Sequence, residues 1–311
     1  MFEYLLNELV KLNTHMHNAG VPLILGGGMG LYLRDTCLEN FGPRSPRYPQ
    51  RPNARSTEDL DVLLSADIIA DAEKMKRVRD IIRDTLDYQV KVENFQFERT
   101  IGPDAAGPTV GIDLLSAPPS PDREDQVKMG DVRARPHGVT GIHGRLTREA
   151  AGIDFGKIPI DLGALIETSA GNIETSAGNI ETSTEAITEL YIPSSFNYLI
   201  LKLHAFHDRR ERQDPKSDRG RHHAFDIFRI VSDMREEDWR SSEQHWERDR
   251  DEIYLRQAAH FRRDYFEDDT SEGILRLKEN EGYRKNREQF EQYIPYILGD
   301  LRELFPVENT E

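Results

Sequence analysis

One stretch decides how the first half of this chain is interpreted: Arg55-Ser56-Thr57-Glu58-Asp59-Leu60-Asp61-Val62-Leu63-Leu64. Its end is apolar except for one carboxylate, a pattern that predicts a buried strand. Because side chains alternate between the two faces of a strand, one face would carry Arg55, Thr57, Asp59 and Asp61. Two carboxylates about 7 Å apart make a poor core but suit a divalent cation, which prefers oxygen ligands. Taken alone, the stretch is better explained as a strand end with two solvated aspartates. The segments before and after it therefore decide between this interpretation and a cation site.

Length and composition narrow the class of protein. With 311 residues the chain can form one large domain or two ordinary ones, and 37% hydrophobic content is typical of a folded protein. The net charge of −15 argues against a general binder of nucleic acids or anionic membranes, while leaving room for a local basic pocket. The single cysteine, Cys37, excludes a disulfide framework and a cysteine-based zinc site. With no signal peptide and no long apolar run, we expect a soluble cytoplasmic protein with no membrane partner.

A glycine turn precedes the aspartates. Residues 21–25 predict a short strand, Gly26-Gly27-Gly28 follows, and residues 29–34 predict a helix. Backbone N–H groups at a glycine turn and at a helix N-terminus bind anions, although a flexible turn has the same sequence. Between this turn and the aspartates lies a proline- and arginine-rich loop, residues 39–57. It is interpreted either as a surface insertion or as a grip on a polyanionic substrate.

A third carboxylate lies in a later strand. Residues 66–86 predict a helix, and 89–92 and 95–98 alternate as half-buried strands do. The apolar run 109–115 predicts another strand, interrupted by Asp113. Two strands that each carry a carboxylate would pair around one cation site. Residues 117–145 are rich in proline and glycine and predict loops, and the tandem repeat within 166–183 has no assigned chemistry.

The second half of the chain predicts helices. Amphipathic patterns recur from Tyr191 onward, and one of them, 285–304, contains Pro295, which would kink it. We therefore expect an α+β fold. A mixed sheet flanked by helices would occupy residues 1–190, and a helical bundle domain would occupy residues 191–311.

Gly26-Gly27, Asp59-Leu60-Asp61 and Asp113 together resemble the polymerase-beta-like nucleotidyltransferase superfamily, whose signature is Gly-Gly or Gly-Ser, then Asp-x-Asp, then a third acidic residue. The pattern from Arg55 to Asp61, with its downstream partners, looks like the AbiEii/AbiGii-type toxins; these partners are Lys202, Arg209, Asp218 and Asp226. The chain departs from the pattern in its long glycine-to-aspartate spacing and in Gly28, where many members carry a small hydroxyl residue.

The resemblance implies a site and a reaction. Metal ligands and catalytic residues would be Asp59, Asp61 and Asp113, holding Mg²⁺ or Mn²⁺. Nucleotide-binding residues would be Gly26, Gly27, Arg55, Thr57, Lys202, Arg209 and Asp226, with Asp226 orienting Lys202 or an arginine. An NMP would move from an NTP to an RNA or protein hydroxyl, and a cognate antitoxin would be a partner. Two alternatives stay open: a noncatalytic nucleotide-binding or antitoxin-like module, and a small-molecule transferase of the aminoglycoside type.

Overall fold

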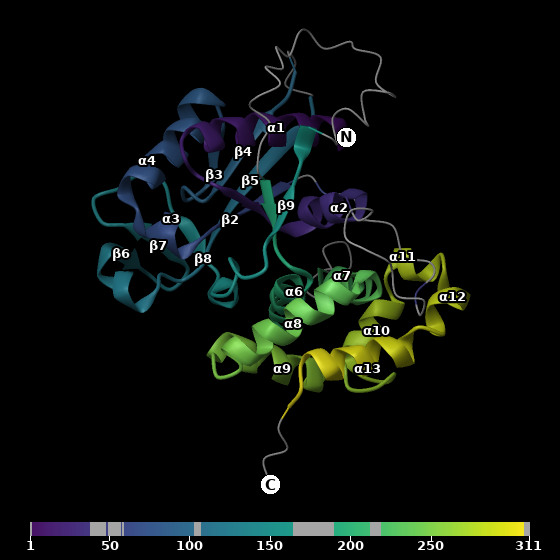
Figure 1. Cartoon of the computed structure of the whole chain (residues 1–311). Coiled ribbons are helices and arrows are strands. Elements are labelled where there is room, and N and C mark those ends of the chain that lie inside the picture. The colour runs from purple at the N-terminus through teal and green to yellow at the C-terminus, as the bar shows by residue number, and fades with distance from the viewer. Residues whose placement is uncertain are drawn as a thin grey trace. The chain divides into compact units, whose positions relative to one another are not determined.

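The computed structural model describes residues 2–37, 48, 57, 59–102, 107–163, 190–211 and 219–307. The chain divides into two compact units. Unit 1 comprises Met1–Leu38 and Ser56–Pro193, and unit 2 comprises Glu39–Arg55 and Ser194–Glu311. The predicted α+β class is confirmed, because unit 1 contains a mixed sheet and the described part of unit 2 after Ser194 is helical (Figure 1).

Unit 1 is built on a ten-stranded sheet in which β5 and β2 are neighbours. The strand order is β6-β7-β8-β5-β2-β1-β10-β9, and the hairpin of β3 and β4 joins through β4 to β5. The strands are β1 (Leu23–Leu25), β2 (Asp59–Leu64), β3 (Gln89–Val92), β4 (Gln96–Thr100), β5 (Thr109–Ser116), β6 (Val127–Met129), β7 (Arg133–Pro136), β8 (Gly144–Leu146), β9 (Ile158–Ile160) and β10 (Leu190–Ile192). The helices are α1 (Phe2–Asn18), α2 (Gly27–Cys37), α3 (Ala66–Ala70) and α4 (Ala72–Asp80).

The two faces of the central strands differ. One face is apolar and buried, and it includes Leu60, Val62, Leu64, Ile112 and Leu114. Helices α1 and α3 pack against these strands, and α3 and α4 pack against β7 (Figure 1). Because β2 and β5 alternate between faces, the carboxylates of the same strands lie on the opposite face. Burial of the apolar face therefore fixes which way the aspartates point.

Two predictions for this half were wrong in detail. Residues 117–145, expected to be loops, contain β6, β7 and β8. Strands of three or four residues are too short to show periodicity, and Pro136, Gly138, Gly141 and Gly144 suggested loops, although Pro136 and Gly144 lie within β7 and β8. The single helix expected over residues 66–86 is divided at Asp71, which caps α4 through hydrogen bonds from the N–H groups of Glu73 and Lys74. A π-helical turn, Ile81–Thr85, then ends it.

Unit 2 is a set of helices around an aromatic core. They are α6 (Ser195–Arg209), α7 (Arg219–Asp233), α8 (Glu236–Asp249), α9 (Ile253–Tyr265), α10 (Glu272–Lys278), α11 (Glu281–Arg284), α12 (Arg287–Glu291) and α13 (Ile294–Leu304). Pro295 lies in the first turn of α13, where its missing N–H costs no hydrogen bond. The expected kink is therefore a break between α12 and α13. No helix among the described residues is long and apolar enough to cross a membrane.

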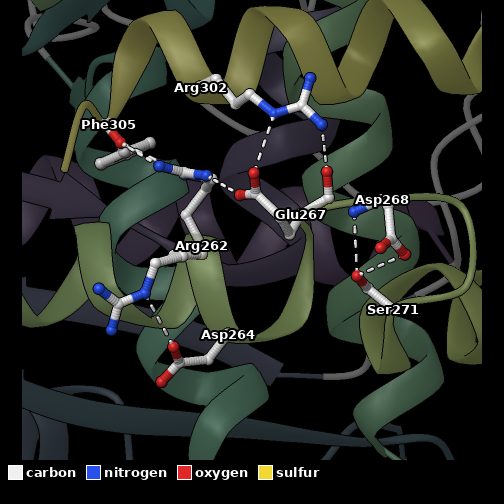
Figure 2. Close-up of polar contacts among 8 residues, drawn as sticks. Arg262, Asp264, Glu267, Asp268, Ser271, Arg302 and Phe305 are labelled. Atoms are coloured by element: carbon white, nitrogen blue, oxygen red, sulfur yellow. Dashed lines mark hydrogen bonds and ion pairs between the residues drawn. The ribbon is translucent and has the colours of Figure 1, made fainter. Parts of the chain in front are cut away.

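Hydrogen bonds from two side chains, Tyr48 and Arg262, hold α13 and the residue that follows it within unit 2. Tyr48 donates a hydrogen bond to Asp300 on α13, with 2.6 Å between Oη and Oδ2. Arg262 on α9 is 4% exposed and donates to the carbonyl of Phe305 from Nε at 3.3 Å and from Nη2 at 3.0 Å. Figure 2 shows its guanidinium between that carbonyl and the carboxylate of Glu267, which also pairs with Arg302. These bonds satisfy a carbonyl at the C-terminus of α13 that no helical N–H can reach.

Candidate functional site

The three aspartates of the signature lie on two neighbouring strands. Strands β2 and β5 are parallel, and their register makes Asp61 the direct partner of Asp113 and Asp59 the partner of Gly111. Adjacent strands lie about 4.8 Å apart, and residues two apart on a strand about 7 Å. All three carboxylates therefore project from one face within a small area. Asp59 is exposed, whereas Asp61 and Asp113 are half-buried.

Glycines make room for two of these carboxylates. Gly27 has φ of +57°, and a Cβ built on it would lie 1.6 Å from Oδ2 of Asp61. A Cβ on Gly111 would lie 2.2 Å from Oδ1 of Asp59. The N–H of Gly26 donates to the carbonyl of Asp61 at 2.8 Å. The glycine turn thus lies directly against the aspartate strand, and α2 begins at Gly27 with its N–H groups at the same place.

Thr57 lies beside the start of α2. A Cβ built on Gly28 would lie 2.9 Å from Cβ of Thr57 and 3.2 Å from its hydroxyl oxygen. The glycine at position 28 therefore leaves space that the Thr57 side chain occupies. The side chain of Thr57 thus places a hydroxyl beside position 28.

Several neighbours act on the carboxyl of Asp113. Burial raises the pKa of its carboxyl, and the negative charge of Asp59 raises it further. A hydrogen bond from Nε2 of Gln96 to its Oδ2, at 2.8 Å, lowers that pKa, as do the charges of Lys91 and Arg145. The pKa of Lys91 is raised, first by its hydrogen bond to Glu98 and also by Asp59 and Asp113. Cations of unit 1 therefore lie near the aspartates.

The donor set can be tested against a divalent cation. Among the residues that the structure describes, no three His, Cys, Asp or Glu side chains gather closely enough to hold one ion together. Magnesium, however, usually takes one or two carboxylates and completes its shell with water and substrate phosphates. The repulsion between Asp59 and Asp113, visible in the raised pKa of Asp113, is the kind that a cation relieves. The carboxylates on this face, taken two at a time, therefore suit magnesium or manganese.

The remaining predicted residues belong to unit 2. Nζ of Lys202 lies 2.7 Å from Oδ2 of Asp226, and their side chains are 9% and 0% exposed. Asp226 therefore holds Lys202, one of the two kinds of partner expected for it, and a part of this pair in nucleotide binding stays a prediction. Arg209 is half-buried at the end of α6. Arg55 and Asp218 lie outside the described residues.

Sequence patterns alone did not reveal four residues of the site: Lys91, Gln96, Gly111 and Arg145. Gln96 is the cross-strand partner of Asp113, and Arg145 is the partner of Leu115, two residues beyond it. Only strand pairing brings them to the aspartates, so no local pattern identifies them. A weak signal existed for Gly111, because a glycine inside a strand often marks a close approach.

Comparison of the chain with protein-family models, with curated proteins and with solved structures finds no match. The functional interpretation therefore depends on the site itself. What the site offers is three carboxylates on one sheet face, a glycine turn at a helix N-terminus, and cations nearby.

Proposed function

We propose that this chain is a nucleotidyltransferase of the polymerase-beta-like superfamily that moves an NMP from an NTP to a hydroxyl acceptor. The observation that supports it most directly is the side-by-side placement of Asp61 and Asp113, with Asp59 on the same face and Gly27 packed against Asp61. Phosphoryl chemistry on a triphosphate needs oxygen ligands for metal ions, and an anion-binding helix N-terminus beside them. AbiEii/AbiGii-type toxins are the subgroup that its residue pattern favours.

Each residue has a role in the proposed reaction. Asp59 and Asp61, with Asp113, would hold Mg²⁺ or Mn²⁺, which when bound neutralises charge on the phosphates. Gly26 and Gly27 cradle the triphosphate at the start of α2: the N–H of Gly26 donates to the carbonyl of Asp61 and fixes the turn, while the N–H groups from Gly27 onward bind the phosphates.

Asp113 accepts the proton of the attacking hydroxyl. Gln96 holds its Oδ2, which leaves Oδ1 for the proton. The acceptor oxygen forms a bond to the α-phosphorus as the bond to pyrophosphate breaks.

The resemblance assigns the remaining contacts. It gives Lys202, which lies 2.7 Å from Asp226, a positive charge for the phosphates, to which Arg209 and Arg55 would add. Thr57 provides the hydroxyl that Gly28 lacks. An antitoxin partner would silence the enzyme by covering the site.

The test is transfer of label from each α-labelled NTP, with Mg²⁺ or Mn²⁺, to total RNA, to lysate protein and to aminoglycosides. We expect wild type to label one acceptor class and the double variant Asp59→Asn with Asp61→Asn to label none. Equal labelling by both would remove the enzyme claim. NTP binding without any transfer would favour the noncatalytic module, and aminoglycoside labelling would favour the small-molecule transferase.

A further inference from the structure

We propose that one end of the unit 1 sheet binds the phosphate backbone of an RNA acceptor and leads its hydroxyl to Asp113. This end, called here the basic sheet end, consists of Lys128, Arg133, Arg135 and Arg145. The proposal rests on the proposed function and adds the class of acceptor to it.

Strand register places the four cations on the same face as the aspartates. Arg145 on β8 is the partner of Leu115, which follows Asp113 by two residues and so shares its face. Arg133 on β7 is the partner of Arg145. Arg135 follows Arg133 by two residues, and Lys128 on β6 is its partner. The four positions therefore form a continuous row across β8, β7 and β6 that begins next to Asp113.

Repulsion between neighbouring cations makes such a row destabilising to the folded sheet. Like charges directly opposite each other in a sheet are destabilising, and this face has two such pairs, Arg133 with Arg145 and Arg135 with Lys128. Glu93 neutralises Arg133. Arg145 and Lys128 are exposed, and within the described part of the chain neither forms an ion pair. In a protein of net charge −15, a row of cations with two exposed members indicates an anionic ligand.

The charges of this row act on its neighbours. Arg135 and Arg133 on β7 lower the pKa of His143, which directly precedes β8, after burial, which lowers it most. The positive charge of β7 therefore extends to the start of β8.

The order of strands sets the direction of approach. Strand β1, which leads into Gly26-Gly27, adjoins β2 on the side away from β5. The basic sheet end lies beyond β5, on the other side of the aspartates. On that side the direct partner of Asp113 is Gln96 on β4, and β8 adjoins β5 at Leu115 and Ser116. With the triphosphate at the glycine turn, an acceptor that reaches Asp113 along β8 crosses Arg145. A phosphate-bearing chain fits this path, whereas a polycationic aminoglycoside would be repelled.

The test measures RNA binding separately from catalysis. The variant Lys128→Ala with Arg145→Ala removes the two exposed cations that lack ion pairs. Its matched control, Lys76→Ala with Arg77→Ala, makes the same charge change on α4, where Lys76 is half-exposed and Arg77 exposed. The probe is a labelled single-stranded RNA of mixed sequence, followed by fluorescence anisotropy over a salt series.

We expect the Lys128/Arg145 variant to bind RNA at least tenfold more weakly and the control to bind as wild type does. Removing two phosphate contacts should reduce the slope of log K against log salt by about 1.4, since each contact contributes about 0.7 for single strands. In transfer assays the single variant Lys128→Ala, which leaves the residues around the aspartates in place, should raise the KM for RNA and leave the KM for NTP unchanged. Four outcomes would overturn the proposal. Wild type could fail to bind RNA, or the Lys128/Arg145 variant could bind RNA as tightly as wild type does. The control could lose as much affinity as that variant, or transfer could label protein in place of RNA. If wild type transfers NMP to none of the acceptors, the result counts against the proposed function instead.

Discussion

Asp61 on β2 and Asp113 on β5 are direct partners in a parallel pair of strands, although 52 positions separate them in the chain, from 61 to 113. Their carboxylates lie side by side on the face that the core leaves open. Gly27 packs against one and Gln96 holds the other.

Replacing either of these carboxylates should abolish transfer without unfolding the protein. We expect Asp61→Asn and Asp113→Asn each to lower the rate at least about 100-fold, because an amide keeps the shape but loses the charge. The matched control is Asp125→Asn, an exposed aspartate between β5 and β6, which should leave the rate unchanged. Rates with labelled NTP and a circular dichroism spectrum check this, and an active Asp61→Asn enzyme would contradict the assignment.

Gly111 should be required for the position of Asp59. The three atoms nearest to a Cβ at Gly111 all belong to Asp59, so Gly111→Ala should turn that carboxylate away. A surface carboxylate turns easily, so we expect at least a tenfold loss of activity with less than about 1 kcal/mol of lost stability.

Gly130→Ala is the control for this variant, because its nearest atom lies 3.9 Å away. It should change neither property. In an Asp59→Ala background, adding Gly111→Ala should cost nothing further. If Gly111→Ala keeps full activity, the observed position of the Asp59 carboxylate is not required for transfer.

The pair of Lys202 and Asp226 should contribute to both stability and nucleotide affinity. Lys202→Met leaves a buried carboxylate, which should cost about 3–5 kcal/mol. Lys202→Met with Asp226→Leu removes both charges and should recover much of that loss. We expect the double variant to show a KM for NTP at least tenfold above wild type. If its KM is unchanged, Lys202 has only a structural role.

Arg262 should matter to unit 2 far more than its neighbour Arg263. Arg262→Ala removes two hydrogen bonds to the carbonyl of Phe305 and the partner of Glu267, which should cost about 2–4 kcal/mol. Arg263→Ala breaks only an exposed pair with Asp264, which should cost less than about 1 kcal/mol. Both tryptophans of the chain lie on α8, so tryptophan fluorescence in urea reports the unfolding of unit 2. Equal midpoints for the two variants would show that the Arg262 bonds do not stabilise the unit.

His245 should make unit 2 less stable in acid. Burial lowers its pKa from 6.5 to about 4, although Asp249 opposes this. The unfolded chain therefore binds a proton more readily, so stability is greatest above about pH 6.5 and falls as the pH drops toward 4. The full difference corresponds to about 3 kcal/mol. In His245→Gln the fluorescence-detected stability should depend less on pH over this window, and an unchanged slope would exclude His245 as the cause.

The sequence by itself determined the local parts of this protein. The alternation from Asp59 to Leu64 and the apolar run around Asp113 predicted β2 and β5, because burial of one strand face leaves a period of two in the chain. The glycine turn before α2 was visible for the same local reason, since its residues are consecutive. A helical second half followed from periodicity of about 3.6.

Tertiary structure alone decided which of these parts meet. The register that pairs Asp61 with Asp113, the contact of Gly111 with Asp59 and the row from Arg145 to Lys128 all join residues from different strands. Sequence did not reveal β6, β7 and β8, because strands of three or four residues are stabilised by their neighbours rather than by their own pattern. Pairing between strands far apart in the chain depends on burial of the whole sheet face, and no local stretch encodes it.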